Sequence, residues 1–200
     1  MYDFFGSDNH FSHENILVYT ERPYADPLEM NEAMIARWNA QVAPGSRVLL
    51  LGDFAMGRIA ESLPLVGRLN GEIELLAGNH DRCADMHGEK ALAWREKYLE
   101  AGFVAVHQGN IRVEVVDGLE LPMSHFPYHG DSHEEDRYTE LRPRDEGEWL
   151  VHGHVHDRWR VNGRQINVGL DAWGGRLVTP QEILEIIEQG EIQLEKLEWV

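Results

Sequence analysis

The sequence is poor in cysteine and in basic residues. Cys83 is the one cysteine in 200 residues, which excludes an internal disulfide framework and a metal site built from several thiolates. The 18 lysines and arginines are outnumbered by 35 acidic residues, which gives a net charge of −17. Because so acidic a chain repels polyanions, we expect it to bind neither long nucleic acid nor an anionic membrane surface.

Long hydrophobic runs are also missing. Apolar runs such as residues 48–51 are far shorter than the roughly 18 residues of a membrane-spanning helix. The first five residues lack the basic and apolar regions of a secretory signal. Together with a hydrophobic content of 42%, these absences predict a soluble cytoplasmic protein in which residues 1–200 form a single domain.

In the first half of the chain, strand signals alternate with helix signals. Apolar runs that fit buried strands lie at residues 2–5, 47–51 and 72–77. Helical periodicity predicts helices over about 27–41, after the start signal Asp26-Pro27-Leu28-Glu29, and over about 58–69, where Pro64 and Gly67 are unfavourable. Alternating strands and helices are typical of an α/β fold with a parallel sheet.

The second half is richer in strand signals. A helix is expected over about 89–101, followed by a hairpin of residues 111–116 and 119–124 around Asp117-Gly118. Short strands at 149–151 and 165–168, a helix at about 180–188 and a last strand at about 191–198 complete the expected elements. The polar stretch 127–147 is expected to be a long surface loop.

Polar side chains that can bind metal follow five of the predicted strands. The five segments are Asp8-Asn9-His10, Gly52-Asp53, Gly78-Asn79-His80-Asp81, Ser124-His125 and His152-Gly153-His154-Val155-His156. In open α/β sheets, the carboxyl ends of the strands define the crevice in which ligands bind. An Asp after one strand is often only a turn former or a helix cap, but five such strand ends indicate one shared site.

Seven of these side chains are candidate metal ligands, and they offer oxygen and nitrogen but no sulfur: Asp8, His10, Asp53, Asn79, His125, His154 and His156. Seven ligands are too many for one tetrahedral site and suit two divalent ions that share a carboxylate. Their chemistry fits manganese, iron, zinc, cobalt or nickel better than calcium. With two aspartates and a bridging hydroxide, such a centre carries a charge of about +1, which would attract a small phosphate anion.

The motifs resemble those of the calcineurin-like metallophosphoesterase superfamily, whose pattern is D-x-H, G-D, G-N-H-D/E, a single His and G-H-x-H. All five blocks occur in this order between residues 8 and 156. Residues 7–16, the tripeptide Arg22-Pro23-Tyr24 and residues 166–171 resemble a small subgroup of bacterial and phage phosphoesterases. The resemblance implies a four-layer fold, a β-sandwich of two mixed sheets flanked by helices.

The resemblance also implies a role for each candidate residue. The first metal would be held by Asp8, His10 and His156, the second by Asn79, His125 and His154, and Asp53 would bridge both. We expect manganese to be the preferred metal. His80 would lie outside the ligands as the catalytic residue that protonates the leaving oxygen, and Asp81 is expected to orient its imidazole.

Three further residues are candidates for binding substrate. The subgroup resemblance implies that His13 lies close to the phosphate or supports the ligands. Arg22 and Arg82 are candidates to hold a substrate phosphate with two parallel hydrogen bonds, and a surface ion pair is the alternative for each. His152 is expected to support the ligand loop, and the loop 127–147 is expected to cover the pocket.

Three hypotheses about function follow. The first is a phosphodiesterase that hydrolyses small phosphodiesters, such as cyclic nucleotides, by in-line attack of a hydroxide that bridges the metals. The second is a phosphomonoesterase or nucleotide pyrophosphatase with the same centre. The third is a non-catalytic scaffold, which we expect to have lost ligands or His80, whereas all are present. Protein phosphatase activity is not expected, because no Asp-Arg-Gly element follows Asp53 and the third block ends in Asp81.

Overall fold

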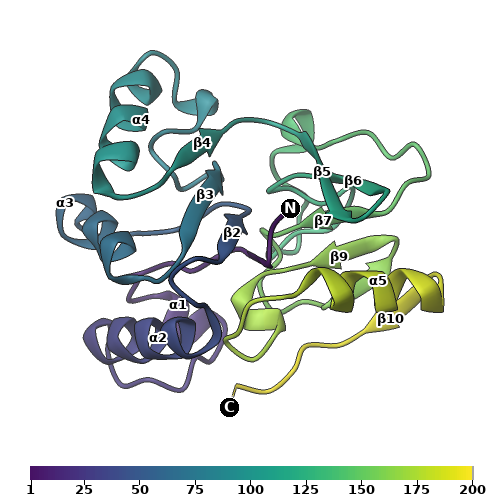
Figure 1. Ribbon diagram of the computed structural model, residues 1–200, viewed down its shortest axis with the longest axis horizontal. Coiled ribbons are helices and arrows are strands. Elements are labelled where there is room, and N and C mark those ends of the chain that lie inside the picture. The colour runs from purple at the N-terminus through teal and green to yellow at the C-terminus, as the bar shows by residue number, and fades with distance from the viewer. Residues whose placement is uncertain (200) are drawn as a thin grey trace.

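Two β-sheets form the centre of the fold in the computed structural model, which describes residues 1–199 (Figure 1). Val200, the last residue of the predicted single domain, lies outside the described residues. The first sheet is parallel, in the order β1-β2-β3-β4, with strands Phe4–Gly6, Arg47–Leu50, Glu72–Leu76 and Ala105–His107. The second sheet is mixed, in the order β10-β8-β9-β7-β6-β5, with strands Ile192–Leu194, Val161–Gly163, Gln165–Asn167, Leu150–His152, Leu119–Met123 and Ile111–Val116.

Helices flank the two sheets. The α-helices are α1 Ile16–Tyr19, α2 Pro27–Gln41, α3 Ile59–Ser62, α4 Lys90–Ala101 and α5 Pro180–Gln189. Figure 1 shows α2, α3 and α4 on the side of the first sheet that faces away from the second sheet, and α5 against the second sheet, where it contacts β5. The α/β class with two sheets flanked by helices is therefore confirmed, and the four-layer arrangement stays a prediction. None of the helices in residues 1–199 is long and apolar enough to cross a membrane.

The central strand β2 is buried on both faces. Val48 and Leu50 pack with Trp38 of α2 in the core between the first sheet and its helices. Leu49 and Leu51 point the other way, into the core between the two sheets. Because successive side chains of a strand point to opposite faces, a continuous apolar run is the pattern of a strand covered on both sides.

The predicted helix over 27–41 is confirmed residue for residue as α2. Asp26 caps it by accepting hydrogen bonds from the backbone N–H groups of Leu28 and Glu29, at 2.8 and 2.9 Å. The predicted helix over 58–69 is wrong in its second half. Only α3 is α-helical there, and a 3₁₀-helix, Leu63–Arg68, follows it, because the ring of Pro64 removes a donor and does not fit an α-helix interior.

The structure also contains elements that the sequence did not predict. They are α1, the three-residue strands β4 and β8, and 3₁₀-helices at Asp85–His87, Thr139–Leu141 and Leu170–Ala172, all too short to show a clear hydrophobic period. The last predicted strand, over about 191–198, is confirmed only as β10, Ile192–Leu194. Beyond it, the chain leaves the sheet, and Leu197 forms an isolated bridge with Trp173.

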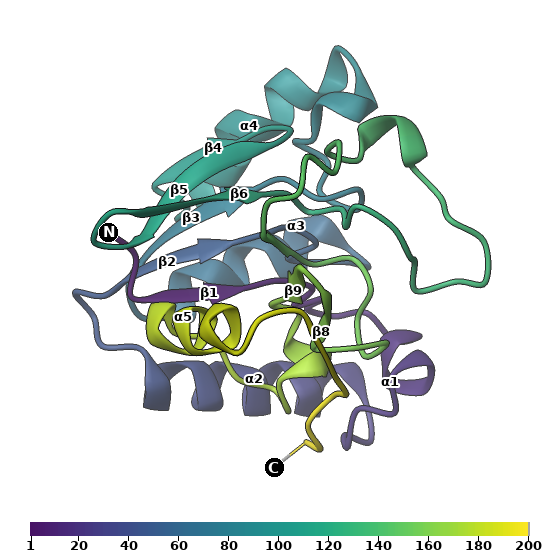
Figure 2. The ribbon, with the colours of Figure 1, turned by 90° about the vertical axis from the view of Figure 1, so that its right-hand side faces the viewer.

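The loop after β1 runs along the loop after β2, on the side of the molecule where α1 and the loop 127–147 also lie (Figure 2). The backbone N–H groups of Asp8 and His10 donate to the carbonyls of Gly52 and Asp53 at 2.9 and 3.0 Å. Strands β6 and β7 are also parallel to each other. The carboxyl ends of strands from both sheets thus bring their loops together at one edge.

Candidate metal centre

Five of the seven candidate ligands have a left-handed backbone. The φ angles are 57° at Asp8, 51° at His10, 57° at Asp53, 70° at His154 and 52° at His156. This conformation is uncommon for residues other than glycine and costs on the order of 1–3 kcal/mol where it is strained. Such backbone persists only where the surroundings enforce it, and it is concentrated at functional sites.

The motif glycines allow these loops to approach one another closely. A Cβ atom on Gly52 would lie 2.6 Å from the Cα of Gly78 and 2.6 Å from Nδ1 of His125. A Cβ atom on Gly153 would collide with Ser7 and lie 2.7 Å from Oδ2 of Asp8. The glycines therefore leave the space in which the ligand side chains converge.

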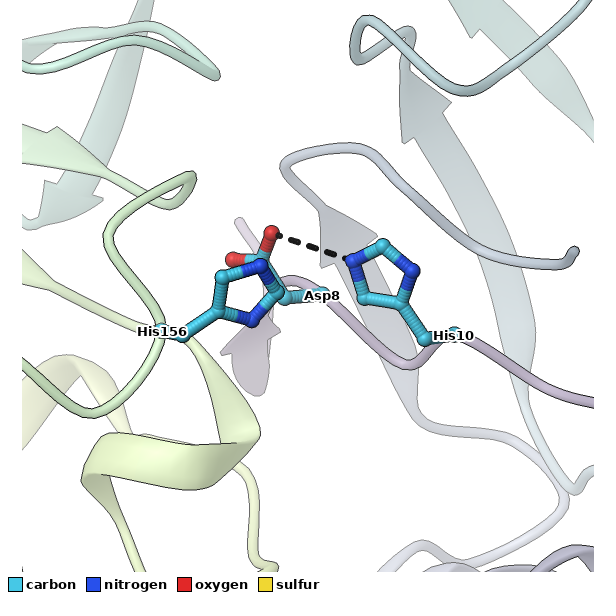
Figure 3. Close-up of side chains that lie close together, drawn as sticks. All are labelled: Asp8, His10 and His156. Atoms are coloured by element: carbon cyan, nitrogen blue, oxygen red, sulfur yellow. Dashed lines mark ion pairs between the residues drawn. The ribbon is translucent and has the colours of Figure 1, made fainter. Parts of the chain in front are cut away.

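Asp8, His10 and His156 form the first group of converging ligand atoms, which lie within 4.8 Å of one another (Figure 3). His10 Nε2 lies 3.8 Å from Asp8 Oδ1. Nδ1 of His156 lies 3.1 Å from Oδ2 of Asp171. That contact leaves Nε2 of His156 free to bind a metal ion.

A second group of three consists of Asp8, Asp53 and His125, also within 4.8 Å of one another. Asp8 belongs to both groups, and Oδ2 of Asp53 lies close to a histidine of each, 3.7 Å from Nε2 of His10 and 3.4 Å from Nε2 of His125.

Asn79 and His154 complete the set beside His125. The side-chain oxygen of Asn79 lies 2.9 Å from Nε2 of His125 and 3.1 Å from Nδ1 of His154. All seven candidate ligands are thus brought together at one place, although they come from five separate loops.

Several buried polar atoms of this cluster have no hydrogen-bond partner among the described residues. They are Oδ1 of Asp8 and both ring nitrogens of His10. A buried polar atom without a partner costs about 1–3 kcal/mol, and a bound cation would satisfy Oδ1 of Asp8 and one ring nitrogen of His10 together. The Asp and His groups could therefore hold metal ions, and their nitrogen and oxygen donors fit a first-row divalent metal.

Burial favours the neutral form of two candidate ligands, His10 and His154. Loss of hydration lowers the pKa of His154 and holds the pKa of His10 well below its usual value. A neutral imidazole is the form that binds metal.

His125 and Asp53 behave as an ion pair. Burial alone would lower the pKa of His125, but the charge and hydrogen bond of Asp53 outweigh it and raise the pKa to about 9. Burial alone would raise the pKa of Asp53, yet His125 keeps it well below its usual value. In the metal-free protein, His125 is therefore protonated at neutral pH.

In two further candidate ligands, one ring nitrogen lies within hydrogen-bond distance of an oxygen atom from a residue outside the motifs. Nδ1 of His125 lies 2.6 Å from the carbonyl of Leu51, and Nε2 of His154 lies 3.0 Å from Oδ2 of Asp131. Such partners fix the orientation of metal-binding imidazoles. Asp131 was not predicted, because it is one of many acidic residues in a polar loop and nothing local distinguishes it.

Arg22 occupies neither of the two places expected for it. Its guanidinium is fully buried and pairs with Asp171 at 2.7 Å. It also donates to the backbone carbonyls of Asp8 and Asn9 at 2.8 and 2.7 Å. Arg22 therefore stabilises the first ligand loop from within the core, and its burial corrects both the substrate-binding and the surface-pair predictions.

Arg82 also lies away from the pocket. Its side chain is exposed, and its guanidinium lies 4.8 Å from the centre of the Trp94 ring. An exposed stack of a cation on an aromatic ring accounts for its position. The geometry gives no support to a contact between Arg82 and a substrate in the pocket.

Asp81 does not contact the imidazole of His80. Its carboxylate accepts hydrogen bonds from the backbone N–H groups of Gly78 and Asp53 at 2.9 and 2.8 Å, and from the Tyr98 hydroxyl at 3.3 Å. Burial and the charge of Asp53 raise its pKa to about 6. Asp81 therefore holds two ligand loops together, which corrects its expected role in orienting His80.

A pocket of about 450 Å³ opens over the cluster. His80 lines it, with 41% of its side chain exposed and Nε2 4.0 Å from Oδ2 of Asp53. His13 lines it as well, and burial lowers its pKa to about 4. Three residues of the loop 127–147 also line it: Ser132, His133 and Arg137.

Comparison with known proteins finds relatives along nearly the whole chain. The Gene 66 protein of Mycobacterium phage L5 is 33% identical over 195 residues, which cover 92% of each chain. The Gene 66 protein of Mycobacterium phage D29 is 35% identical over 192 residues, which cover 92% of this chain and 94% of that protein. The protein MJ1445 of Methanocaldococcus jannaschii is 28% identical over 195 residues, with 93% and 91% covered. No family model matches the chain.

Solved structures are similar as well. The crystal structure of the protein AQ665 from Aquifex aeolicus matches with a TM-score of 0.68 and 22% identity, covering 92% of this chain and 97% of that chain. The two proteins share a fold. The structure of a novel archaeal phosphodiesterase matches with a TM-score of 0.39 and 20% identity, covering 83% of this chain and 81% of that chain.

Proposed function

This chain belongs to the family of the Gene 66 proteins of Mycobacterium phages L5 and D29, and we propose that it is a metal-dependent phosphohydrolase with the four-layer calcineurin-like metallophosphoesterase fold. Its substrates are small phosphodiesters such as cyclic nucleotides. One observation carries the proposal: the ligand-type atoms of Asp8, His10 and His156, and those of Asp8, Asp53 and His125, converge in two groups, in which every residue except the partly exposed His156 is buried.

The seven candidate ligands would hold two divalent ions, with manganese as the preferred metal. Asp8, His10 and His156 would hold the first ion, the side chains of Asn79, His125 and His154 would hold the second, and the carboxylate of Asp53 would be shared by both. When bound, such a pair of ions neutralises the phosphoryl oxygens and lowers the pKa of the attacking water.

His80 is the catalytic acid. Its imidazole is partly exposed to the pocket, beside the ligands, and its backbone N–H donates to Oδ1 of Asp53 at 2.8 Å. This hydrogen bond fixes the start of the side chain relative to the centre. A group in this position can protonate the leaving oxygen, which is the step that limits esters with poor leaving groups.

Charge and volume support small substrates. A volume of about 450 Å³ is within the range of sites for small molecules. The net charge of −17 opposes the approach of a long polyanion. We therefore propose that neither long nucleic acid nor a membrane is a partner.

A panel of phosphoesters tests the function. The purified protein is loaded with manganese, nickel, zinc, iron or magnesium and assayed on bis-p-nitrophenyl phosphate, p-nitrophenyl phosphate, and 2′,3′- and 3′,5′-cyclic nucleotides. We expect the diesters to be hydrolysed faster than the monoester, and Asp53→Asn to abolish turnover. Faster hydrolysis of the monoester would make the protein a phosphomonoesterase. Metal-loaded protein that is inactive on every ester would identify a non-catalytic scaffold.

A further inference from the structure

Asp131 connects the loop 127–147 to the metal centre. Its carboxylate is buried, although the loop around it is largely exposed. Oδ2 lies 3.0 Å from Nε2 of His154. Oδ1 accepts hydrogen bonds from Nε and Nη2 of Arg137 at 3.1 and 2.8 Å. One carboxylate therefore holds a candidate metal ligand and an arginine at the same time.

The contact with Asp131 decides which nitrogen of His154 carries the proton. An ionised carboxylate only accepts hydrogen bonds, and Asp131 is ion-paired with Arg137 at 2.8 Å and with Arg142 at 3.3 Å. Nε2 of His154 must then be the donor, so the lone pair of the neutral ring is on Nδ1. Nδ1 is the atom that faces Asn79, at 3.1 Å from its side-chain oxygen.

Arg137 presents a positive charge to the pocket. Among the described residues that line the pocket, it is the one arginine, and no lysine lines it. Its Nε and Nη2 atoms are occupied by Asp131, while Nη1 makes no hydrogen bond within residues 1–199. Its side chain is 37% exposed. A guanidinium fixed on one edge and free on the other is suited to bind a phosphate oxygen.

We propose that Arg137 binds a phosphate group in the pocket and that Asp131 is a positioning residue, which holds both Arg137 and His154. The proposal rests on the proposed function for its substrate class, because the same phosphoryl group would contact the metal centre and Arg137. It assigns a role to the loop 127–147, namely to recognise the anion that reacts.

Binding of inorganic phosphate tests the role of Arg137 without any turnover. The full chain is loaded with manganese, and the dissociation constant for phosphate is measured by calorimetry. Arg137→Gln should weaken binding about tenfold or more, because a charge-assisted hydrogen bond is lost. Arg144→Gln is the matched control, since Arg144 lies exposed in the same loop and does not line the pocket, and it should bind phosphate as the wild type does. Equal binding by both variants, or no binding by the wild type, would overturn the proposal.

Metal affinity and the tautomer of His154 test the role of Asp131. Asp131→Asn should weaken manganese binding about 10- to 100-fold and weaken phosphate binding as well. Asp136→Asn is the control, because Asp136 accepts hydrogen bonds from Gly130 and Arg142 of the same loop and should change neither constant. In the metal-free wild type, ¹⁵N NMR should find the proton of His154 on Nε2, and a proton on Nδ1 would contradict the assignment.

The results also separate this proposal from the proposed function. If the wild type binds phosphate through Arg137 but hydrolyses no ester, the proposed phosphohydrolase activity is refuted and the proposed role of Arg137 in anion binding is retained. Hydrolysis that persists with unchanged phosphate affinity in Arg137→Gln would refute the anion site and leave the phosphohydrolase. If Asp131→Asn does not fold, the comparison of the two arginine variants still decides the proposal.

Discussion

At the scale of single residues, the buried negative charge of Asp53 needs a positive partner close by. Asp53 is buried and lies close to both His10 and His125. Without a metal, its charge is balanced by a proton on His125. With a metal, the cation takes the place of that proton, so the metal-free and metal-bound states differ in protonation as well as in ligation.

The pH dependence of metal binding follows from His125. Its pKa of about 9 in the metal-free protein means that a metal ion must displace a proton below that pH. Manganese affinity should therefore rise from pH 6.5 towards 9, by up to about tenfold per pH unit for one displaced proton. Calorimetric dissociation constants at pH 6.5, 7.5 and 8.5 measure this trend, and a constant independent of pH would contradict it.

Stability of the metal-free protein should change in the opposite direction. The pKa of His125 is raised from 6.5 to about 9 on folding, so its contribution is fully present below pH 6.5 and is lost as pH rises through 9. Asp53, whose pKa is held well below 3.8, contributes stability above that pH and loses it under acid conditions. Urea unfolding of the chelator-treated protein at pH 6.5 and 9 measures the first effect, and an increase in stability at pH 9 would refute the ion pair.

His80→Ala tests the acid role. The variant should bind both metals, because His80 is not a ligand, but should lose about 10²–10⁴-fold in kcat on esters with poor leaving groups. Esters of p-nitrophenol, which leave without protonation, should be affected much less. Metal content and kcat on both kinds of ester are the measurements. Equal losses on both would assign His80 to another role.

The candidate ligands could be predicted from the sequence, whereas the residues that support them could not. Each ligand is part of a short local motif at a strand end, so residue type and spacing identify it. Asp131 and Arg22 are recognised only by burial and by contacts with residues far away in the chain, such as His154 and Asp171. The same limitation explains why the role of Asp81 was predicted wrongly, because its partners are the backbone N–H groups of Gly78 and Asp53.

At the scale of elements, the strand ends and their glycines determine how closely the loops approach. Gly153 follows β7 and faces the loop after β1, and a methyl group there would collide with Ser7. The long elements were predictable, as α2 illustrates, because a cap and several turns of periodicity agree. The strands β4 and β8 depend on pairing with neighbours, which a three-residue segment does not encode.

Gly153→Ala should therefore disrupt both the fold and the centre. Crowding of a closely packed site costs about 1–3 kcal/mol in the free energy of unfolding, and displacement of Asp8 should weaken metal binding. Gly45→Ala is the control, because a Cβ atom there would meet nothing within 4 Å. Urea unfolding and manganese titration compare the two variants, and equal stability would show that the loops move apart without cost.

At the scale of the whole molecule, the candidate ligands come from both sheets. Asp8, Asp53 and Asn79 follow β1, β2 and β3 of the first sheet, and His125 and His154 follow β6 and β7 of the second. The sequence pattern predicted a parallel half and a β-rich half. The strand ends already indicated one shared site, whereas the packing of the two sheets as a sandwich was implied only by the resemblance of the motifs, because the pairing of sheets is a long-range property.

Metal binding should for this reason stabilise the entire chain. A ligand at 100 times its dissociation constant adds about 2.7 kcal/mol to the free energy of unfolding, which for a domain of this size raises Tm by about 5–10 °C. Thermal unfolding with chelator and with excess manganese measures the shift. Asp53→Asn should lose most of it, since a neutral amide cannot replace the bridging carboxylate. A variant that retains the full shift would show that the ions bind elsewhere, away from the junction of the two sheets.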